Sequence, residues 1–131
     1  MFKFSVSEKY IWTKHAQAKM AYYNISPSRV KRIMKTPQRI EEGIATGTKA
    51  FMQPVSYKFK NGTKTWNQEY WVMAVTQNKK PDVENKKYGS KFENKFNIKI
   101  ISAWRYPGVT KPGASLPQEI LSEISEALMN L

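Results

Sequence analysis

Apolar residues alternate with polar ones over residues 2–7 and then recur at helical spacing, so we expect the chain to open extended and then enter a helix. Thr13 suits the N-cap of this helix, and Asn24 suits its end because asparagine tolerates left-handed backbone angles. The residues expected to face inward are Ala16, Met20 and Tyr23. This pattern predicts a helix that begins at Lys14.

A second helix is expected to follow directly. Ser26 is a good N-cap, and Pro27 suits the first helical position because its missing N–H would have no partner there. Pro37 should end the helix near Lys35. Its inner side is expected to present Val30, Ile33 and Met34, and its outer side Arg29, Arg32 and Lys35, with Lys31 beside them.

The middle of the chain has the pattern of strands. Asn61-Gly62 is a favoured tight-turn pair and predicts a hairpin between the segments on either side of it. Pro54 interrupts the first of these segments and indicates a strand edge or a bulge. Residues 70–75 are apolar throughout, as expected for a central strand. The expected strands cover residues 39–42, 49–59, 68–77 and 96–104.

The last segment of the chain predicts an amphipathic helix. Ser115 and Gln118 form a capping box before an apolar stripe, which must pack on the chain's own sheet or on a partner. The stripe consists of Ile120, Leu121, Ile124, Leu128 and Leu131. The expected fold is therefore one α+β domain over residues 1–131: two N-terminal helices packed on an antiparallel sheet of about four strands, plus a C-terminal helix over 115–131.

The charge of the chain favours a polyanionic partner. The formal net charge is +12, and residues 1–112 hold all 22 basic residues with 7 of the 10 acidic ones, which gives that part +15. Such a field raises the association rate of anionic partners, and RNA is the partner we expect. Lysine richness for solubility is the alternative. The lysine-rich segment 78–94 is expected to be a loop, either a phosphate-contacting arm or a solvated insertion.

The sequence gives no sign of a membrane protein or an exported one. No apolar run approaches the length that spans a bilayer, and the first residues lack the apolar stretch of a signal peptide, so we expect a cytoplasmic protein without a membrane partner. With one histidine, no cysteine and scattered carboxylates, neither a metal site nor a cofactor is expected.

The candidate chemistry centres on His15, the only histidine, which precedes Lys19 by one helical turn. The two side chains would project together, so that the imidazole could exchange a proton while the ammonium group neutralises a phosphate. The alternative is that His15 is a structural residue near a helix start, which has good local reasons for hydrogen bonding.

The order of these motifs resembles a known family. His15-Ala16 followed by Lys19-Met20, then Ile25-Ser26, and a late strand with Ser102-Ala103-Trp104, are similar to the small toxin-like family that includes BrnT and RelE-type ribonucleases. The likeness covers most of residues 13–106 and is strongest to small domains with a His-Ala-x-x-Arg-Met pattern. Lys19 stands where arginine is usual. Its ammonium group offers a point charge in place of a planar guanidinium that can donate two hydrogen bonds to one phosphate.

This resemblance implies a toxin-like protein that acts on RNA and has a neutralising antitoxin or another protein partner. Metal-independent endoribonuclease activity is one hypothesis, with His15 as general acid or base and with Lys19 and Arg105 stabilising the charged transition state. RNA contacts are expected from Lys14, Arg29, Arg32 and Lys35, with Trp104 or Tyr106 as a stacking surface. For Trp104 the alternative is a place in the core, where large aromatic residues of late strands mostly pack.

Two further hypotheses stay open. The protein could be a nucleic-acid-binding module without catalysis, which would use the same basic and aromatic residues. It could also be a protein-interaction module that binds through its C-terminal helix, and a homodimer is one form that such a contact could take.

Overall fold

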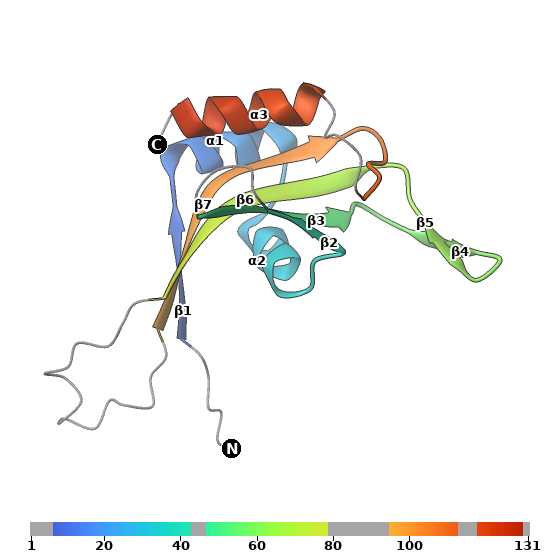
Figure 1. Cartoon of the computed structure of the whole chain (residues 1–131), viewed down its shortest axis with the longest axis horizontal. Coiled ribbons are helices and arrows are strands. Elements are labelled where there is room, and N and C mark those ends of the chain that lie inside the picture. Colours follow the sequence, from blue (N-terminus) through green and yellow to red (C-terminus); the bar gives the residue numbers. More distant parts are fainter. Residues whose placement is uncertain (1–6, 43–46, 79–94, 113–117, 130–131) are drawn as a thin grey trace, which may run out of the picture.

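The computed structural model describes residues 7–42, 47–78, 95–112 and 118–129. Within these ranges the chain forms three helices and seven strands (Figure 1). In chain order they are β1 (Ser7–Trp12), α1 (Lys14–Tyr23), α2 (Pro27–Lys35), β2 (Arg39–Glu41), β3 (Thr48–Pro54), β4 (Lys58–Lys60), β5 (Thr63–Thr65), β6 (Glu69–Asn78), β7 (Lys95–Tyr106) and α3 (Gln118–Met129).

The α+β class is confirmed, but the antiparallel sheet of about four strands is not. The main sheet has five strands in the order β1-β7-β6-β3-β2, and β1 runs parallel to β7, so the sheet is mixed. A separate two-stranded sheet consists of β4 and β5. The expected central strand is confirmed as β6, which lies between β7 and β3 and is buried over Trp71, Val72, Met73 and Ala74.

The alternation over residues 2–7 predicted an extended start, but residues 2–6 lie outside the described part, and the strand β1 over Ser7–Trp12 was not predicted. In the structure β1 begins at Ser7. The rings of Tyr10 and Trp12 stack with their centroids 5.7 Å apart and pack against the core. The parallel partner of β1 lies about ninety residues further along the chain (Ser7 pairs with Lys95), where no local pattern could indicate it.

Both N-terminal helices begin and end as predicted. The Thr13 hydroxyl accepts a hydrogen bond from the Ala16 N–H, and Asn24 adopts the left-handed conformation (φ 58°, ψ 51°) that ends α1. Ser26 caps α2 in the same way through the Arg29 N–H. Thr13 also donates to the carbonyl oxygens of Ile100 and Ile101, at 3.0 and 3.2 Å, so the start of α1 is fastened to β7.

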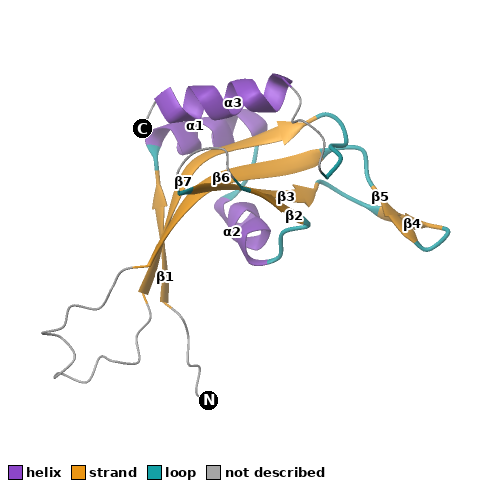
Figure 2. Cartoon of the chain, viewed as in Figure 1, coloured by secondary structure: helices purple, strands orange, loops and turns teal. Residues whose placement is uncertain are grey.

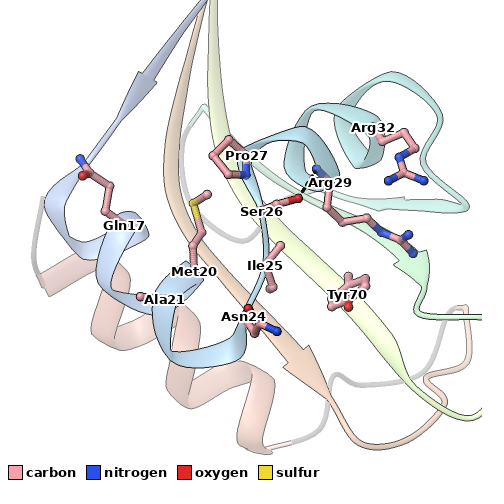
Figure 3. Close-up of a pocket in the computed structure, with 10 residues that line it drawn as sticks. All are labelled: Gln17, Met20, Ala21, Asn24, Ile25, Ser26, Pro27, Arg29, Arg32 and Tyr70. Atoms are coloured by element: carbon pink, nitrogen blue, oxygen red, sulfur yellow. Dashed lines mark hydrogen bonds between the residues drawn. The ribbon is translucent and has the colours of Figure 1, made fainter.

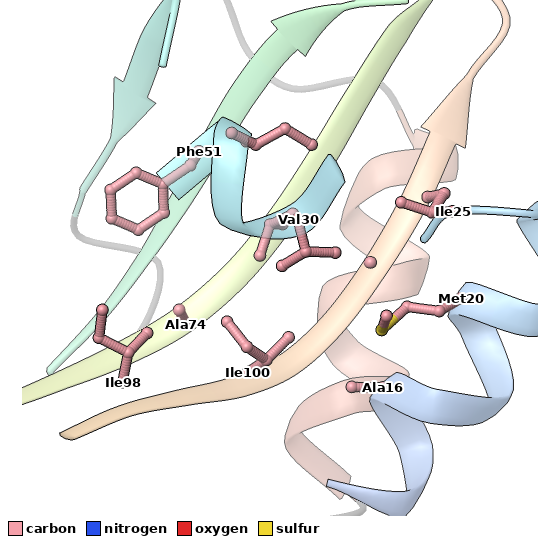
Figure 4. Packing of buried hydrophobic residues seen from close by; sticks show 11 residues of the cluster. Ala16, Met20, Ile25, Val30, Phe51, Ala74, Ile98 and Ile100 are labelled. Atoms are coloured by element: carbon pink, nitrogen blue, oxygen red, sulfur yellow. The ribbon is translucent and has the colours of Figure 1, made fainter. Parts of the chain in front are cut away.

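Helices cover both faces of the sheet (Figure 1). The first face is covered by α1 and α2, whose buried side chains meet those of the sheet in one cluster (Figure 4). That cluster consists of Ala16, Met20, Ile25, Val30, Ile33, Phe51, Val72, Ala74, Ile98, Ile100 and Ala103. The opposite face is covered by α3, so the sheet forms the middle of three layers.

The C-terminal helix packs on the chain's own sheet. Ala127 is buried among Met52, Trp71 and Trp104, and Leu128 packs against the same cluster. Leu121 is 41% exposed. Ser115, the predicted cap, lies outside the described residues, as do Leu131 and the side chains of Ile120 and Ile124; most of the predicted loop 78–94 does too. No helix of the described segments has the length and apolar character needed to cross a membrane.

A β-bulge in β7 changes which side chains face each layer. The pairing of β7 with β6 skips Ile101, between the pairs Met73–Ser102 and Ala74–Ile100. Before the bulge, Ile100 faces α1 and α2, and after it Ala103 does. Trp104 therefore faces α3, where its ring stacks on Trp71 with a centroid distance of 6.2 Å.

The predicted Asn61-Gly62 turn is present, but it joins only the short strands β4 and β5. Both residues have positive φ values, 52° and 79°, as this type of hairpin turn requires. The longer strands β3 and β6 pair around this small hairpin, from Thr48 with Val75 to Pro54 with Glu69. The hairpin therefore projects from the main sheet (Figure 2).

A fully buried carboxylate, that of Glu69, holds one end of the sheet together. Its two oxygens accept four hydrogen bonds: from the indole N–H groups of Trp66 and Trp71 at 2.8 and 3.1 Å, and from the N–H and hydroxyl of Thr110 at 3.0 and 2.8 Å. Arg39 donates to the same Thr110 hydroxyl at 2.7 Å. A buried charge is tolerable only when it is satisfied in this way.

We expect Glu69→Gln to lower the free energy of unfolding by about 2–4 kcal/mol, because its amide NH₂ would face groups that are themselves donors. Urea unfolding followed by tryptophan fluorescence measures the change. The control is Glu42→Gln, which removes an exposed carboxylate 3.1 Å from Lys49 and should cost less than about 0.5 kcal/mol. Equal stability of the two variants would contradict the role of Glu69.

Candidate functional site

Arg29 is a fixed guanidinium group on α2. Its Nη2 donates to the carbonyl oxygens of Pro54 and Val55, at 2.9 and 3.2 Å, at the point where β3 ends. Its Cζ lies 4.7 Å from the centroid of the Tyr70 ring, within cation–π distance. The side chain is half-buried, and its Nε is buried without a hydrogen-bond partner among the described residues.

Burial lowers the pKa of the Arg29 guanidinium, and the charge of Arg32 lowers it further, while Tyr70 acts in the opposite direction. An arginine nevertheless stays protonated at neutral pH. Arg29 is therefore a partly desolvated cation with an unpaired N–H and a like charge nearby. An anion that binds beside Arg29 and Arg32 would offset the repulsion between their like charges.

Two adjoining pockets share Arg29 and Arg32. The first has a volume of about 630 Å³ and lies between the end of α1, the start of α2 and Tyr70 (Figure 3). The second, of about 530 Å³, lies between the end of α2, the end of β3 and Lys64 of β5. Arg32 is exposed, so its charge is available to both pockets.

Aromatic and basic side chains alternate beside the second pocket. Tyr57 and Phe59 are 55% and 69% exposed and meet edge to face, with centroids 5.8 Å apart. Lys64 places its Nζ 4.1 Å from the centroid of Tyr57 and donates to Gln38 at 2.8 Å. We call the surface formed by Arg29, Arg32, Tyr57, Lys64 and Tyr70 the basic groove.

Arg105 lies next to this groove. Its Nη2 donates to the carbonyl oxygen of Tyr23 at 2.7 Å, and its Cζ is 5.7 Å from the Tyr70 centroid. Arg105 and Tyr70 are register partners in neighbouring strands and therefore share a face of the sheet. The structure thus places two arginines, Arg29 and Arg105, at one tyrosine ring.

His15 and Lys19 of α1 are not part of the basic groove. The Lys19 Nζ pairs with Glu126 of α3 at 3.2 Å, and only 19% of the Lys19 side chain is exposed. His15 is half-buried, and its Nε2 is buried without a hydrogen-bond partner in the described part. Neither residue lines either of the two pockets, and the convergence of His15, Lys19 and Arg105 on one concavity stays a prediction.

The remaining predicted residues divide between surface and core. Lys14 and Lys35 are exposed, and Lys35 lies on α2 one turn after Lys31 and Arg32. Trp104 is 2% exposed and stacked on Trp71, as its alternative role in the core requires. Tyr106 is half-buried at the end of β7.

Sequence reasoning missed Tyr57, Lys64 and Tyr70. Tyr70 belongs to the predicted central strand, and it shares the face of α1 and α2 with Val72 and Ala74 because side chains alternate along a strand. A signal for the hairpin was present: residues 57–60 alternate aromatic and lysine residues directly before the Asn61-Gly62 turn.

The arrangement is suited to binding an extended anion. Cations and aromatic rings adjoin over two pockets, while the imidazole that acid–base catalysis would need is elsewhere on α1. In the described segments, no three histidine or acidic side chains are grouped as metal ligands would be. A comparison of this chain with models of protein families, with curated proteins and with solved structures gave no match.

We expect Arg29 to contribute more than Arg32 to the free energy of unfolding. Arg29→Ala should lower the free energy of unfolding by about 1–3 kcal/mol, because two carbonyl oxygens lose a charged donor. Arg32→Ala removes an exposed side chain and should change it by less than about 0.5 kcal/mol. Urea unfolding of both variants measures the difference; a larger loss for Arg32→Ala would contradict the assignment.

Proposed function

We propose that this protein is a toxin-like RNA-binding protein and that the basic groove is its RNA-binding surface. The observation that carries the proposal is that two neighbouring pockets share Arg29 and Arg32 and are bordered by Tyr57 and Tyr70. Phosphates need cations at intervals, and unpaired bases need ring faces between them.

The charge of the whole chain supports the same proposal. A formal net charge of +12 attracts any polyanion, but it does not say where the polyanion binds. The groove supplies a location, because Arg29 is held in place by Pro54 and Val55 and loses little conformational freedom when it binds a phosphate. A guanidinium can also grip a phosphate through two N–H groups at once.

Cleavage of the bound RNA is the second candidate. Arg105 favours it, since this predicted catalytic residue shares the Tyr70 ring with Arg29 and so borders the groove. The engagement of Lys19 by Glu126 weighs against it, because that ammonium group is already neutralised. Binding is therefore the function that the geometry supports best.

Removing the exposed cation of the groove tests the binding proposal. We expect Arg32→Ala to weaken RNA binding about three- to tenfold and to reduce the slope of log K against log salt by about 0.7, the value for one lost contact with single-stranded phosphate. Fluorescence anisotropy of a labelled RNA across a salt series measures both quantities.

The matched control is Lys9→Ala, which removes one exposed charge from β1, away from both pockets. It should leave affinity and slope nearly unchanged. Equal losses for Lys9→Ala and Arg32→Ala would show that binding follows net charge alone and would overturn the groove as the site.

Labelled RNA incubated with the protein in chelator tests the second candidate. Binding without cleavage predicts that the RNA stays intact on a denaturing gel, for the wild type and for His15→Ala alike. Fragments that appear with the wild type and disappear with His15→Ala would instead establish metal-independent cleavage, with His15 taking part in proton transfer.

A further inference from the structure

A third pocket, of about 490 Å³, lies at the end of β7, and its lining residue Arg105 is 5.7 Å from the Tyr70 ring of the basic groove. Its walls are largely aromatic: Tyr22 and Tyr23 come from the last turn of α1, and Trp104 and Tyr106 from β7, with Arg105 between them. We call it the tyrosine pocket.

Tyr22 is the exposed wall of the tyrosine pocket. It is 78% exposed, an unusual situation for a large ring at a helix end, and it meets Tyr23 edge to face with centroids 4.8 Å apart. Tyr23 is half-buried and packs against both core clusters. The exposed Tyr22 ring thus packs against the half-buried Tyr23 ring. It can therefore contact a ligand at a low cost in conformational entropy.

The opposite wall is also held in position. A Cβ at Gly108 would come within 2.8 Å of the Cε2 atom of Tyr106, so the Tyr106 ring lies directly over this glycine. Tyr106 also packs against the cluster that contains Trp71 and Trp104. The absence of a side chain at Gly108 is what allows the ring to take this place.

Arg105 connects the tyrosine pocket to the basic groove. It lines the pocket and is held by the Tyr23 carbonyl oxygen, while its Cζ lies 5.7 Å from the Tyr70 ring. The same ring is 4.7 Å from Arg29 in the groove. Cations therefore continue from Arg32 through Arg29 to Arg105, and the tyrosine pocket lies at the end of that series.

We propose that the tyrosine pocket takes an unpaired base of a single-stranded RNA whose phosphates lie along Arg32, Arg29 and Arg105. The inference rests on the proposed RNA binding and specifies its substrate class. An unpaired base can leave its own strand and stack on Tyr22 or Tyr106, whereas the bases of a duplex are enclosed in its stack. The neighbouring guanidinium neutralises the adjacent phosphate.

The first experiment compares ligands and side chains. The probe is a labelled uridine RNA of about twelve nucleotides, within the range that single-stranded sites cover, against a duplex of equal length. The single strand should bind at least about tenfold more tightly. Tyr22→Ala should weaken its binding about tenfold, as loss of one stacked base does, and Tyr22→Phe should bind as the wild type does. Ile40→Ala, at an exposed residue of β2, is the control and should have no effect.

The second experiment reports on stacking itself. A 2-aminopurine placed in the RNA should lose fluorescence on binding to the wild type and to Tyr22→Phe, and retain it with Tyr22→Ala. Gly108→Ala should also reduce the quenching, because the added Cβ displaces the Tyr106 ring. Circular dichroism and unfolding of each variant establish that the fold is intact.

The outcomes separate the two proposals. If the wild type binds neither RNA, both are overturned. If the wild type binds RNA and Arg32→Ala weakens that binding, the groove is supported as the RNA-binding surface. If, in the same series, Tyr22→Ala binds and quenches as the wild type does and the duplex binds as tightly as the single strand, the tyrosine pocket is overturned.

Discussion

One extra residue in a strand, Ile101, determines which groups the candidate site can use. Because side chains alternate along a strand, the bulge exchanges the two faces of β7 for every residue that follows it. Arg105 thereby joins Tyr70 on the face of α1 and α2, and Trp104 joins Trp71 beneath α3. Without the bulge, an arginine would face the apolar cluster under α3, and a tryptophan would take its place beside the groove.

The same region explains why the histidine and lysine of α1 are separated from the groove. Thr13 fastens the start of α1 to the bulge, and Tyr23 accepts from Arg105 at its end, so the helix runs along β7 beyond the last residue of β1. Lys19 then faces α3 and pairs with Glu126, which links helices from opposite layers. On this helix Lys19 is therefore engaged in holding α1 and α3 together.

Much of the fold was accessible from the sequence because its signals are local. Thr13, Asn24 and Ser26 act on backbone groups within a few residues, so the limits of α1 and α2 could be predicted. The parallel pairing of β1 and the bulge at Ile101 could not, since each depends on a partner strand. The candidate site divides in the same way. The basic side of α2 was evident from the sequence, but the position of Tyr70 beside it depends on α2 packing over β6 and on β7 pairing next to β6.

The contact between β1 and β7 has a consequence for how the chain is made. The Thr13 hydroxyl donates to a carbonyl oxygen 87 residues later, and among the described strands β1 pairs with β7 alone. During synthesis, the pairing of β1 and the anchoring of α1 must wait until β7 has been made. A nascent chain stalled before residue 95 would lack the strand with which β1 pairs, so this part of the sheet can form only after β7 has been synthesised.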